Sequence, residues 1–192
     1  YPRRDGLTTY AISGDDHEGW YGKKEGLDIG RWAENAMHEA GRDDWRHIGF
    51  VEGHVELVNS ETGASSTLTL MHPGGGTAYA VSYQPQKIVE SLEGGQKPAV
   101  LILGHYHKLS LNNIRNVWVV QAGTTQDQTV FMRKKRIDAH VGGAILELKQ
   151  DPATGAITRC KGDLIRYFDR GYYTANRWNY DGPVGLPERA KA

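Results

Sequence analysis

The most informative stretch of this 192-residue chain is A-V-L-I-L-G-H-Y-H, residues 99–107. Its first half, residues 100–103, is a short apolar run after a turn-like segment, a pattern typical of a strand buried on both faces. Gly104 ends the run, and His105 and His107 follow at alternate positions, where extended backbone gives both side chains the same general direction. Two imidazoles at the carboxyl end of a buried strand are well placed to hold a metal ion, because open α/β sheets usually bind ligands at that edge.

Two other predicted strands also end in polar side chains and a glycine-containing loop. The first covers residues 7–13 and the second residues 66–71. The polar residues that follow them are Asp15, Asp16, His17 and His72. Because the carboxyl ends of parallel strands share one edge of a sheet, we expect these side chains to converge with the histidines of the first stretch. Oxygen and imidazole ligands without thiolate suit manganese, iron or zinc, whereas a structural zinc site more usually recruits cysteine.

The hydrophobic pattern predicts helices as well as strands. Helical spacing of apolar residues marks residues 28–40 and 85–92. Further strands are predicted at residues 49–59, 117–121, 142–149 and 157–167. The glycines at 74–76 suit the wall of a site, but they do not form a P-loop because no Gly-Lys-Ser/Thr follows them.

Composition excludes several classes of protein. Basic and acidic residues balance at 23 each, so net charge favours no particular partner, although residues 133–136 form a local basic run. Cys160 is the single cysteine, which excludes an internal disulfide framework and fits a reducing compartment. No apolar run reaches the ~20 residues that span a bilayer, and no signal peptide is present, so we expect no membrane association.

The order of the motifs resembles that of the calcineurin-like metallophosphoesterases, which runs strand–G-[N/D]-H-[D/E], strand–H, strand–G-H-x-H. Residues 14–18 match the first motif, His72 the second and residues 104–107 the third. The resemblance covers nearly all of residues 1–148. It points in particular to a phage and prokaryotic branch through these segments: 1–6 (Y-P-R-R-D-G), 26–30 (G-L-D-I-G), 72–73 (H-P), 82–88 (S-Y-Q-P-Q-K-I) and 121–133.

This resemblance implies an α/β fold, part of an αββα sandwich with mixed β-sheets, with the two predicted helices packed on an outer face. Residues 1–167 would form the phosphoesterase domain, and residues 168–192 an aromatic and polar tail. Carried over by motif position, His17 would be the catalytic histidine, which stabilises the phosphoryl oxygens or protonates the leaving oxygen. The metal ligands would be Asp16 (with Asp15 as the alternative, because one aspartate is inserted), His72 and His105 for one ion, and His107 for the other.

The implied activity is divalent-metal-dependent hydrolysis of a phosphoester, by a phosphodiesterase or a nuclease. Two ions, manganese in the first place with iron, zinc or magnesium as alternatives, would lie ~3.5–4 Å apart, bind the phosphate and generate a bridging hydroxide. The ligands must be neutral imidazoles, so we expect activity to fall at acid pH.

The first two motifs of that family, D-x-H and G-D-x-x-D, are missing from this sequence. The chain opens on Tyr1 without an initiator Met, so we expect an N-terminal half or another chain to complete the site, and possible homo-oligomers. The expected location is the cytoplasm of a prokaryote or of a phage-infected cell. The alternative is a non-catalytic binding or assembly protein that retains the fold with a degenerate metal site.

The remaining histidines and the basic run have plainer interpretations. We predict a helix-surface position for His38, a loop position for His47 and an exposed strand position for His54. His140 either borders the site or has a structural role. The basic run and the tail aromatics either flank a nucleic acid or form a solvated face and a packed layer.

Overall fold

Strand β5 (Val100–Leu103) is the centre of a five-stranded sheet in the computed structural model, which describes residues 6–15 and 18–167. Its Val100 and Leu101 are fully buried, as the continuous apolar run predicts. β5 pairs in parallel with a strand on each side, and the two outer strands of the sheet run antiparallel to their neighbours. The strand order is β3 (Glu52–Val58), β4 (Ser65–Met71), β5, β7 (Val117–Ala122) and β6 (Leu109–Ile114).

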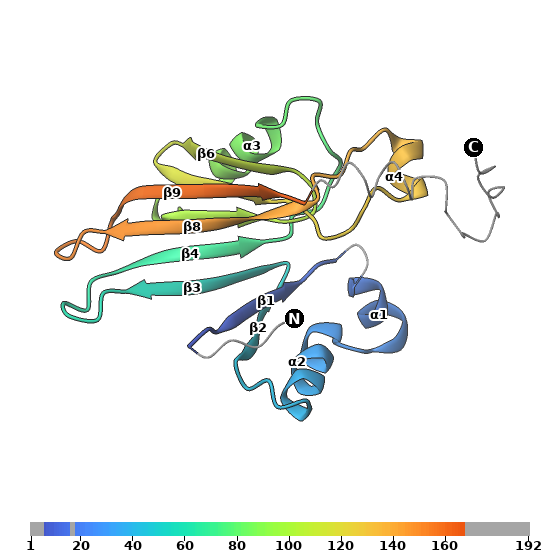
Figure 1. Ribbon diagram of the computed structural model, residues 1–192, viewed down its shortest axis with the longest axis horizontal. Coiled ribbons are helices and arrows are strands. Elements are labelled where there is room, and N and C mark those ends of the chain that lie inside the picture. Colours follow the sequence, from blue (N-terminus) through green and yellow to red (C-terminus); the bar gives the residue numbers. More distant parts are fainter. Residues whose placement is uncertain (1–5, 16–17, 168–192) are drawn as a thin grey trace, which may run out of the picture.

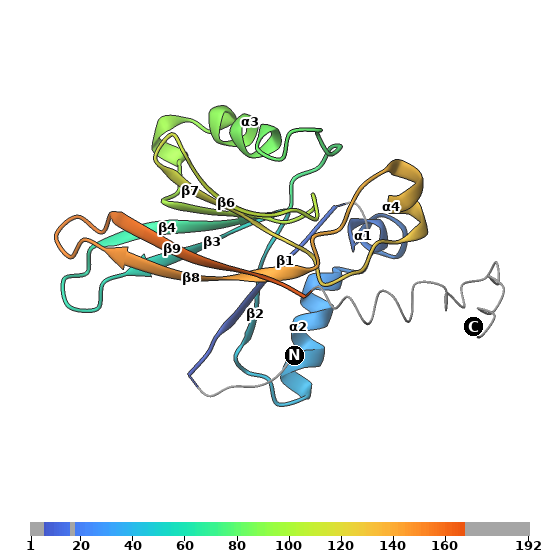
Figure 2. The same ribbon diagram turned by 45° about the horizontal axis from the view of Figure 1, so that its top comes forward.

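The five-stranded sheet is covered on both faces (Figures 1 and 2). Helix α3 (Tyr83–Ser91) lies on one face against β6 and β7, and the antiparallel hairpin of β8 (Gly142–Gln150) and β9 (Ile157–Arg166) lies on the other. The hydrophobic core lies between α3 and the sheet, and contains Val89, Leu101, Leu103, Val117 and Val119.

A second, two-stranded parallel sheet precedes the first in the chain. It pairs β1 (Thr9–Ser13) with β2 (Trp45–Phe50), and helix α2 (Ile29–Glu39) packs on it (Figure 1). The helix begins at a strong N-cap, because the Asp28 carboxylate accepts hydrogen bonds from the backbone N–H groups of Gly30 and Arg31, both at 3.1 Å.

The remaining elements are short. Helix α1 (Glu18–Glu25) joins β1 to α2, a single 3₁₀ turn (Gly94–Gln96) precedes β5, and helix α4 (Val130–Lys135) lies in the connection from β7 to β8. Figure 1 shows α1 and α4 at the same end of the molecule, the end toward which β4 points.

The predicted α/β class with a mixed sheet is confirmed, and both predicted helices are present within two residues of their expected bounds. The strand expected at residues 49–59 is present as β3, but it begins at Glu52, and residues 49 and 50 belong to β2 instead. The break falls at Val51, whose φ of 66° turns β2 into β3. Strand β6 and helices α1 and α4 were not predicted.

Residues 168–192, expected as a separate tail, lie outside the described residues. Within the part of the chain that the structure describes, no helix is long and apolar enough to cross a membrane.

Candidate metal centre

Backbone hydrogen bonds join four chain segments at one edge of the molecule. The N–H of Gly104 after β5 donates to Met71 O at the end of β4, at 2.9 Å. The N–H of His72 donates to Val51 O, and the N–H of Val51 donates to Ser13 O at the end of β1, both at 2.7 Å. The three strand ends that carry the predicted site residues therefore meet, although β1 belongs to the other sheet.

The His72 imidazole lies in a space that two glycines leave open. A Cβ atom on Gly14 would lie 2.5 Å from His72 Nδ1, and one on Gly104 would lie 3.2 Å from His72 Cδ2. The first distance is shorter than real Cβ contacts allow. Any residue other than glycine at position 14 would therefore force the His72 imidazole to move. The glycine of the first motif therefore has a steric role at this edge.

The His105 ring lies edge-on to the His72 ring, with 5.1 Å between the ring centroids and 76° between the planes. His105 Nε2 is 2.7 Å from Gly75 O in the glycine-rich loop after β4. A carbonyl oxygen can only accept a hydrogen bond, so His105 carries its proton on Nε2, and the lone pair of the neutral ring is on Nδ1. The glycine-rich loop thus fixes the tautomer of His105.

The expectation that extended backbone points His105 and His107 in the same direction was wrong, because the G-H-Y-H loop is not extended. His105 and His107 both adopt left-handed conformations, with φ of 69° and 55°. Such conformations cost about 1–3 kcal/mol for residues with side chains and cluster at functional sites. Between them, Tyr106 is 3% exposed, and burial raises the pKa of its phenol. Its side chain therefore anchors the loop in the protein interior.

Of the two aspartates at the end of β1, the structure describes one. Asp15 forms an ion pair with Lys23 of α1 at 2.9 Å, and both side chains are largely exposed. Asp16 and His17, the predicted ligand and the predicted catalytic histidine, lie outside the described residues.

The described residues fit part of a metal centre. His72 and His105 supply two imidazoles of the kind that bind manganese, iron or zinc. Among residues 6–15 and 18–167, no three His, Cys, Asp or Glu side chains gather closely enough to hold an ion. A complete site therefore needs ligands in addition to these two imidazoles.

A cleft of about 410 Å³ adjoins the end of β1. Ser13 and Asp15 line it from the strand end, Lys23 from α1, Leu27 from the loop before α2 and Phe50 from β2. It combines a cation, a carboxylate and an exposed aromatic wall beside Gly14, on which His72 packs. A cavity of this size falls in the range of small-molecule sites.

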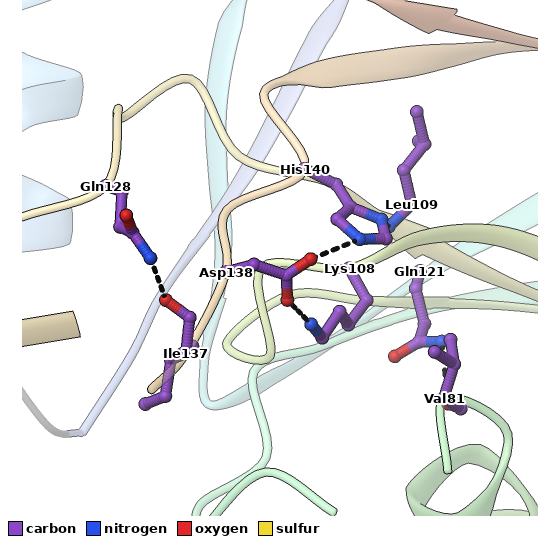
Figure 3. Close-up of polar contacts among 8 residues, drawn as sticks. All are labelled: Val81, Lys108, Leu109, Gln121, Gln128, Ile137, Asp138 and His140. Atoms are coloured by element: carbon purple, nitrogen blue, oxygen red, sulfur yellow. Dashed lines mark hydrogen bonds and ion pairs between the residues drawn. The ribbon is translucent and has the colours of Figure 1, made fainter. Parts of the chain in front are cut away.

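A polar network next to the G-H-Y-H loop was only partly anticipated. It consists of Lys108, Asp138 and His140 (Figure 3), and of these only His140 was considered from the sequence. Lys108 forms an ion pair with Asp138, and the hydrogen bond from Lys108 is the main reason that the pKa of Asp138 is lowered. No sequence spacing links Lys108 to a carboxylate thirty positions away.

The other histidines have structural roles. His54 is an exposed strand residue, as expected. His47 lies in β2 rather than in a loop, and its Nε2 is 3.1 Å from Ser13 Oγ. The loop prediction was wrong because the start of β2, W-R-H-I, has too little apolar character to mark a strand on its own.

No protein-family model and no curated protein sequence matches this chain. Among solved structures, a single mutant of Vps29 from Entamoeba histolytica is similar with a TM-score of 0.43 and 12% identity, over 84% of this chain and 85% of that one. Vacuolar protein sorting 29 from Cryptosporidium parvum is similar with a TM-score of 0.38 and 9% identity, over 84% of this chain and 98% of that one. Similarity at this level assigns no activity to the chain.

Proposed function

We propose that this chain belongs to a divalent-metal-dependent phosphoester hydrolase of the calcineurin-like metallophosphoesterase type, a phosphodiesterase or nuclease. The observation that carries the proposal is the placement of His72 and His105. Their rings lie 5.1 Å apart at an edge where the ends of β1, β4 and β5 meet, in the motif order of that family. The left-handed backbone at His105 adds to this, because such conformations in residues with side chains cluster at functional sites.

The proposed ligands follow the motifs. Asp16, or Asp15 in its place, holds one ion together with His72 and His105, and His107 reaches a second ion. Such ions, manganese first and iron, zinc or magnesium as alternatives, polarise the phosphoryl oxygens and lower the pKa of bound water. The His105 proton on Nε2, fixed by Gly75 O, orients the lone pair on Nδ1 for this role. His17 donates a hydrogen bond or a proton to the leaving oxygen.

The cleft beside β1 is the proposed substrate site. Lys23 supplies a cation for a phosphate ester, and Phe50 supplies an exposed aromatic face, 56% accessible, for an aryl group or a nucleobase. We infer that the remaining ligands of the second ion come from an N-terminal segment or another chain that contributes D-x-H and G-D-x-x-D motifs. We place the protein in the cytoplasm of a prokaryote or of a phage-infected cell, and its single cysteine fits a reducing compartment.

A non-catalytic binding or assembly protein is the second candidate. Two observations favour it: no three potential ligands gather among the described residues, and the Asp15 carboxylate pairs with Lys23. In that case the fold and the histidine edge remain, and the metal-loaded protein hydrolyses no phosphoester.

The deciding experiment measures hydrolysis of bis-p-nitrophenyl phosphate, DNA and RNA by the intact gene product with added Mn²⁺. We expect metal-dependent hydrolysis that His105→Ala lowers by more than about 100-fold, because even outer partners of metal ligands contribute about 10–100-fold. His54→Ala, which removes an exposed histidine of β3, is the matched control and should retain wild-type activity. Metal loading without hydrolysis of any of the three substrates would favour the non-catalytic protein.

A further inference from the structure

His140 contacts the end of the G-H-Y-H loop, in addition to the bond between His105 and Gly75 at its start. The His140 backbone N–H donates to His107 O at 2.9 Å. Its ring Nδ1 accepts the N–H of Leu109 at 3.1 Å, and Figure 3 shows Leu109 beside the ring. The two bonds fall on either side of Lys108, so His140 bridges the loop where it leaves the left-handed His107 and enters β6. A left-handed residue with a side chain persists only where neighbouring groups hold it.

Asp138 and Lys108 orient the His140 ring so that Nδ1 faces the Leu109 N–H. His140 Nε2 lies 3.0 Å from Asp138 Oδ2, and the other oxygen of Asp138 pairs with Lys108 Nζ (Figure 3). A carboxylate accepts, so the proton is on Nε2, and Nδ1 carries the lone pair that the Leu109 N–H requires. Lys108 and His140 are 15% and 19% exposed, whereas the Asp138 carboxylate that joins them is 63% exposed and faces water.

Lys108 and His140 are also hydrogen-bonded to the residues that follow β7. Thr124 N–H donates to His140 O at 3.1 Å, and Gly123 N–H donates to Lys108 O at 2.8 Å. These backbone bonds join the two segments whatever side chain stands at position 140. Of the hydrogen bonds between His140 and the His107–Leu109 backbone, only the bond from the Leu109 N–H to Nδ1 depends on the histidine side chain.

We propose that His140 is a positioning residue for His107. Its ring, oriented by Asp138 and Lys108, holds the His107–Leu109 backbone in the conformation that aims His107 at the second metal. The positioning of the loop is a property of this chain by itself, and its use in metal binding rests on the proposed function above. The structural and the catalytic parts are therefore measured separately.

The structural part is tested by amide hydrogen exchange in metal-free protein. His140→Leu removes the acceptor, and we expect the Leu109 amide to exchange at least about tenfold faster, as a lost hydrogen bond to a shielded group implies. His140→Asn places an amide oxygen near the position of Nδ1 and should restore most of the protection. The Gly104 amide, bonded to Met71 O at the same edge, is the internal reference and should not change. A merely structural destabilisation would raise exchange at both amides.

The metal part is tested on the intact gene product with Mn²⁺ and bis-p-nitrophenyl phosphate. We expect His140→Leu to lower kcat by about 10–100-fold with little change in KM, and His140→Asn to recover most of it. Leu109 exchange within about twofold of wild type in His140→Leu would overturn the positioning role. Faster Leu109 exchange in a protein with no metal-dependent hydrolysis would overturn the proposed function and leave the positioning role standing.

Discussion

At the residue scale, Gly14 is the position at which the site is most sensitive to a single methyl group. A Cβ atom there would lie 2.5 Å from His72 Nδ1, so Gly14→Ala must displace the imidazole without removing any ligand. We predict that the affinity for Mn²⁺ falls by about 10–100-fold, as for other changes that disturb the orientation of a ligand. Calorimetric titration with Mn²⁺ measures this effect.

Gly74→Ala is the matched control for this change. Gly74 lies in the loop after His72, and a Cβ atom there would meet nothing within 4 Å. Equal Mn²⁺ affinity in both variants would show that His72 does not bind the ion.

Asp138 provides a residue-scale prediction about pH. Its pKa is lowered, first by the hydrogen bond from Lys108 and also by the charge of Lys108 and the hydrogen bond from His140. A lowered pKa in the folded state means that the carboxylate stabilises the fold at pH values above its ordinary pKa of about 3.9. That contribution is lost as the pH falls through the lower folded value.

We therefore expect Asp138→Asn to lower the free energy of unfolding at pH 7, and the difference from wild type to shrink below about pH 4. Urea unfolding at both pH values measures it, with Asp43→Asn, an exposed carboxylate outside the network, as the reference. A difference that grows toward acid pH would contradict the sign of the pKa shift.

At the element scale, helix α2 depends on its N-cap residue, Asp28. The Asp28 carboxylate accepts from the N–H groups of Gly30 and Arg31 and also lies 3.5 Å from the Arg31 guanidinium. We predict that Asp28→Ala lowers the free energy of unfolding by about 1 kcal/mol, the usual effect of a lost N-cap. Arg31→Ala removes the exposed ion pair and keeps the cap, so it should change stability by less than about 0.5 kcal/mol. Similar losses in urea unfolding for both variants would assign the effect to the ion pair.

The β8–β9 turn offers a second element-scale test, because Gly155 sits against β4. Gly155 has φ of 76°, and a Cβ atom there would lie 2.3 Å from Ser65 O, whereas Gly63, with φ of 74°, would meet nothing within 4 Å. Both substitutions by alanine carry the left-handed cost of about 1–2 kcal/mol, and Gly155→Ala adds overpacking of about 1–3 kcal/mol. Thermal and urea unfolding of the pair should separate the two costs, and equal losses would mean that the turn does not pack on β4.

Some elements are predictable from the sequence and others are not. The difference lies in how each element is buried. Strand β5 and helix α2 bury a continuous run or a helical stripe, so their apolar residues repeat at the expected spacing. Strand β6 contains Asn112 and Asn113 and is held by pairing with β7, so its own residues give little sign of a strand. Helix α1 contains two glycines and no apolar period, which explains why it was missed.

At the scale of the whole molecule, the sequence predicts the convergence of the site but not its support. Ordered strand ends imply a shared edge, and His72 and His105 do meet there. The contacts of Lys108 and His140 with Asp138 depend on how the long β7–β8 connection folds back on the G-H-Y-H loop. No local sequence pattern predicts that this connection folds back, so the contact between His140 and the His107 backbone is seen only in the structure.

The central claim, a metal centre at the edge that carries His72 and His105, is tested most directly by titrating Mn²⁺ into the chain and measuring free Mn²⁺ by electron paramagnetic resonance. We predict saturable binding by the wild type and by His54→Ala, and affinity at least about 100-fold lower for His105→Ala. No binding by the wild type, or equal binding by His105→Ala, would contradict the account.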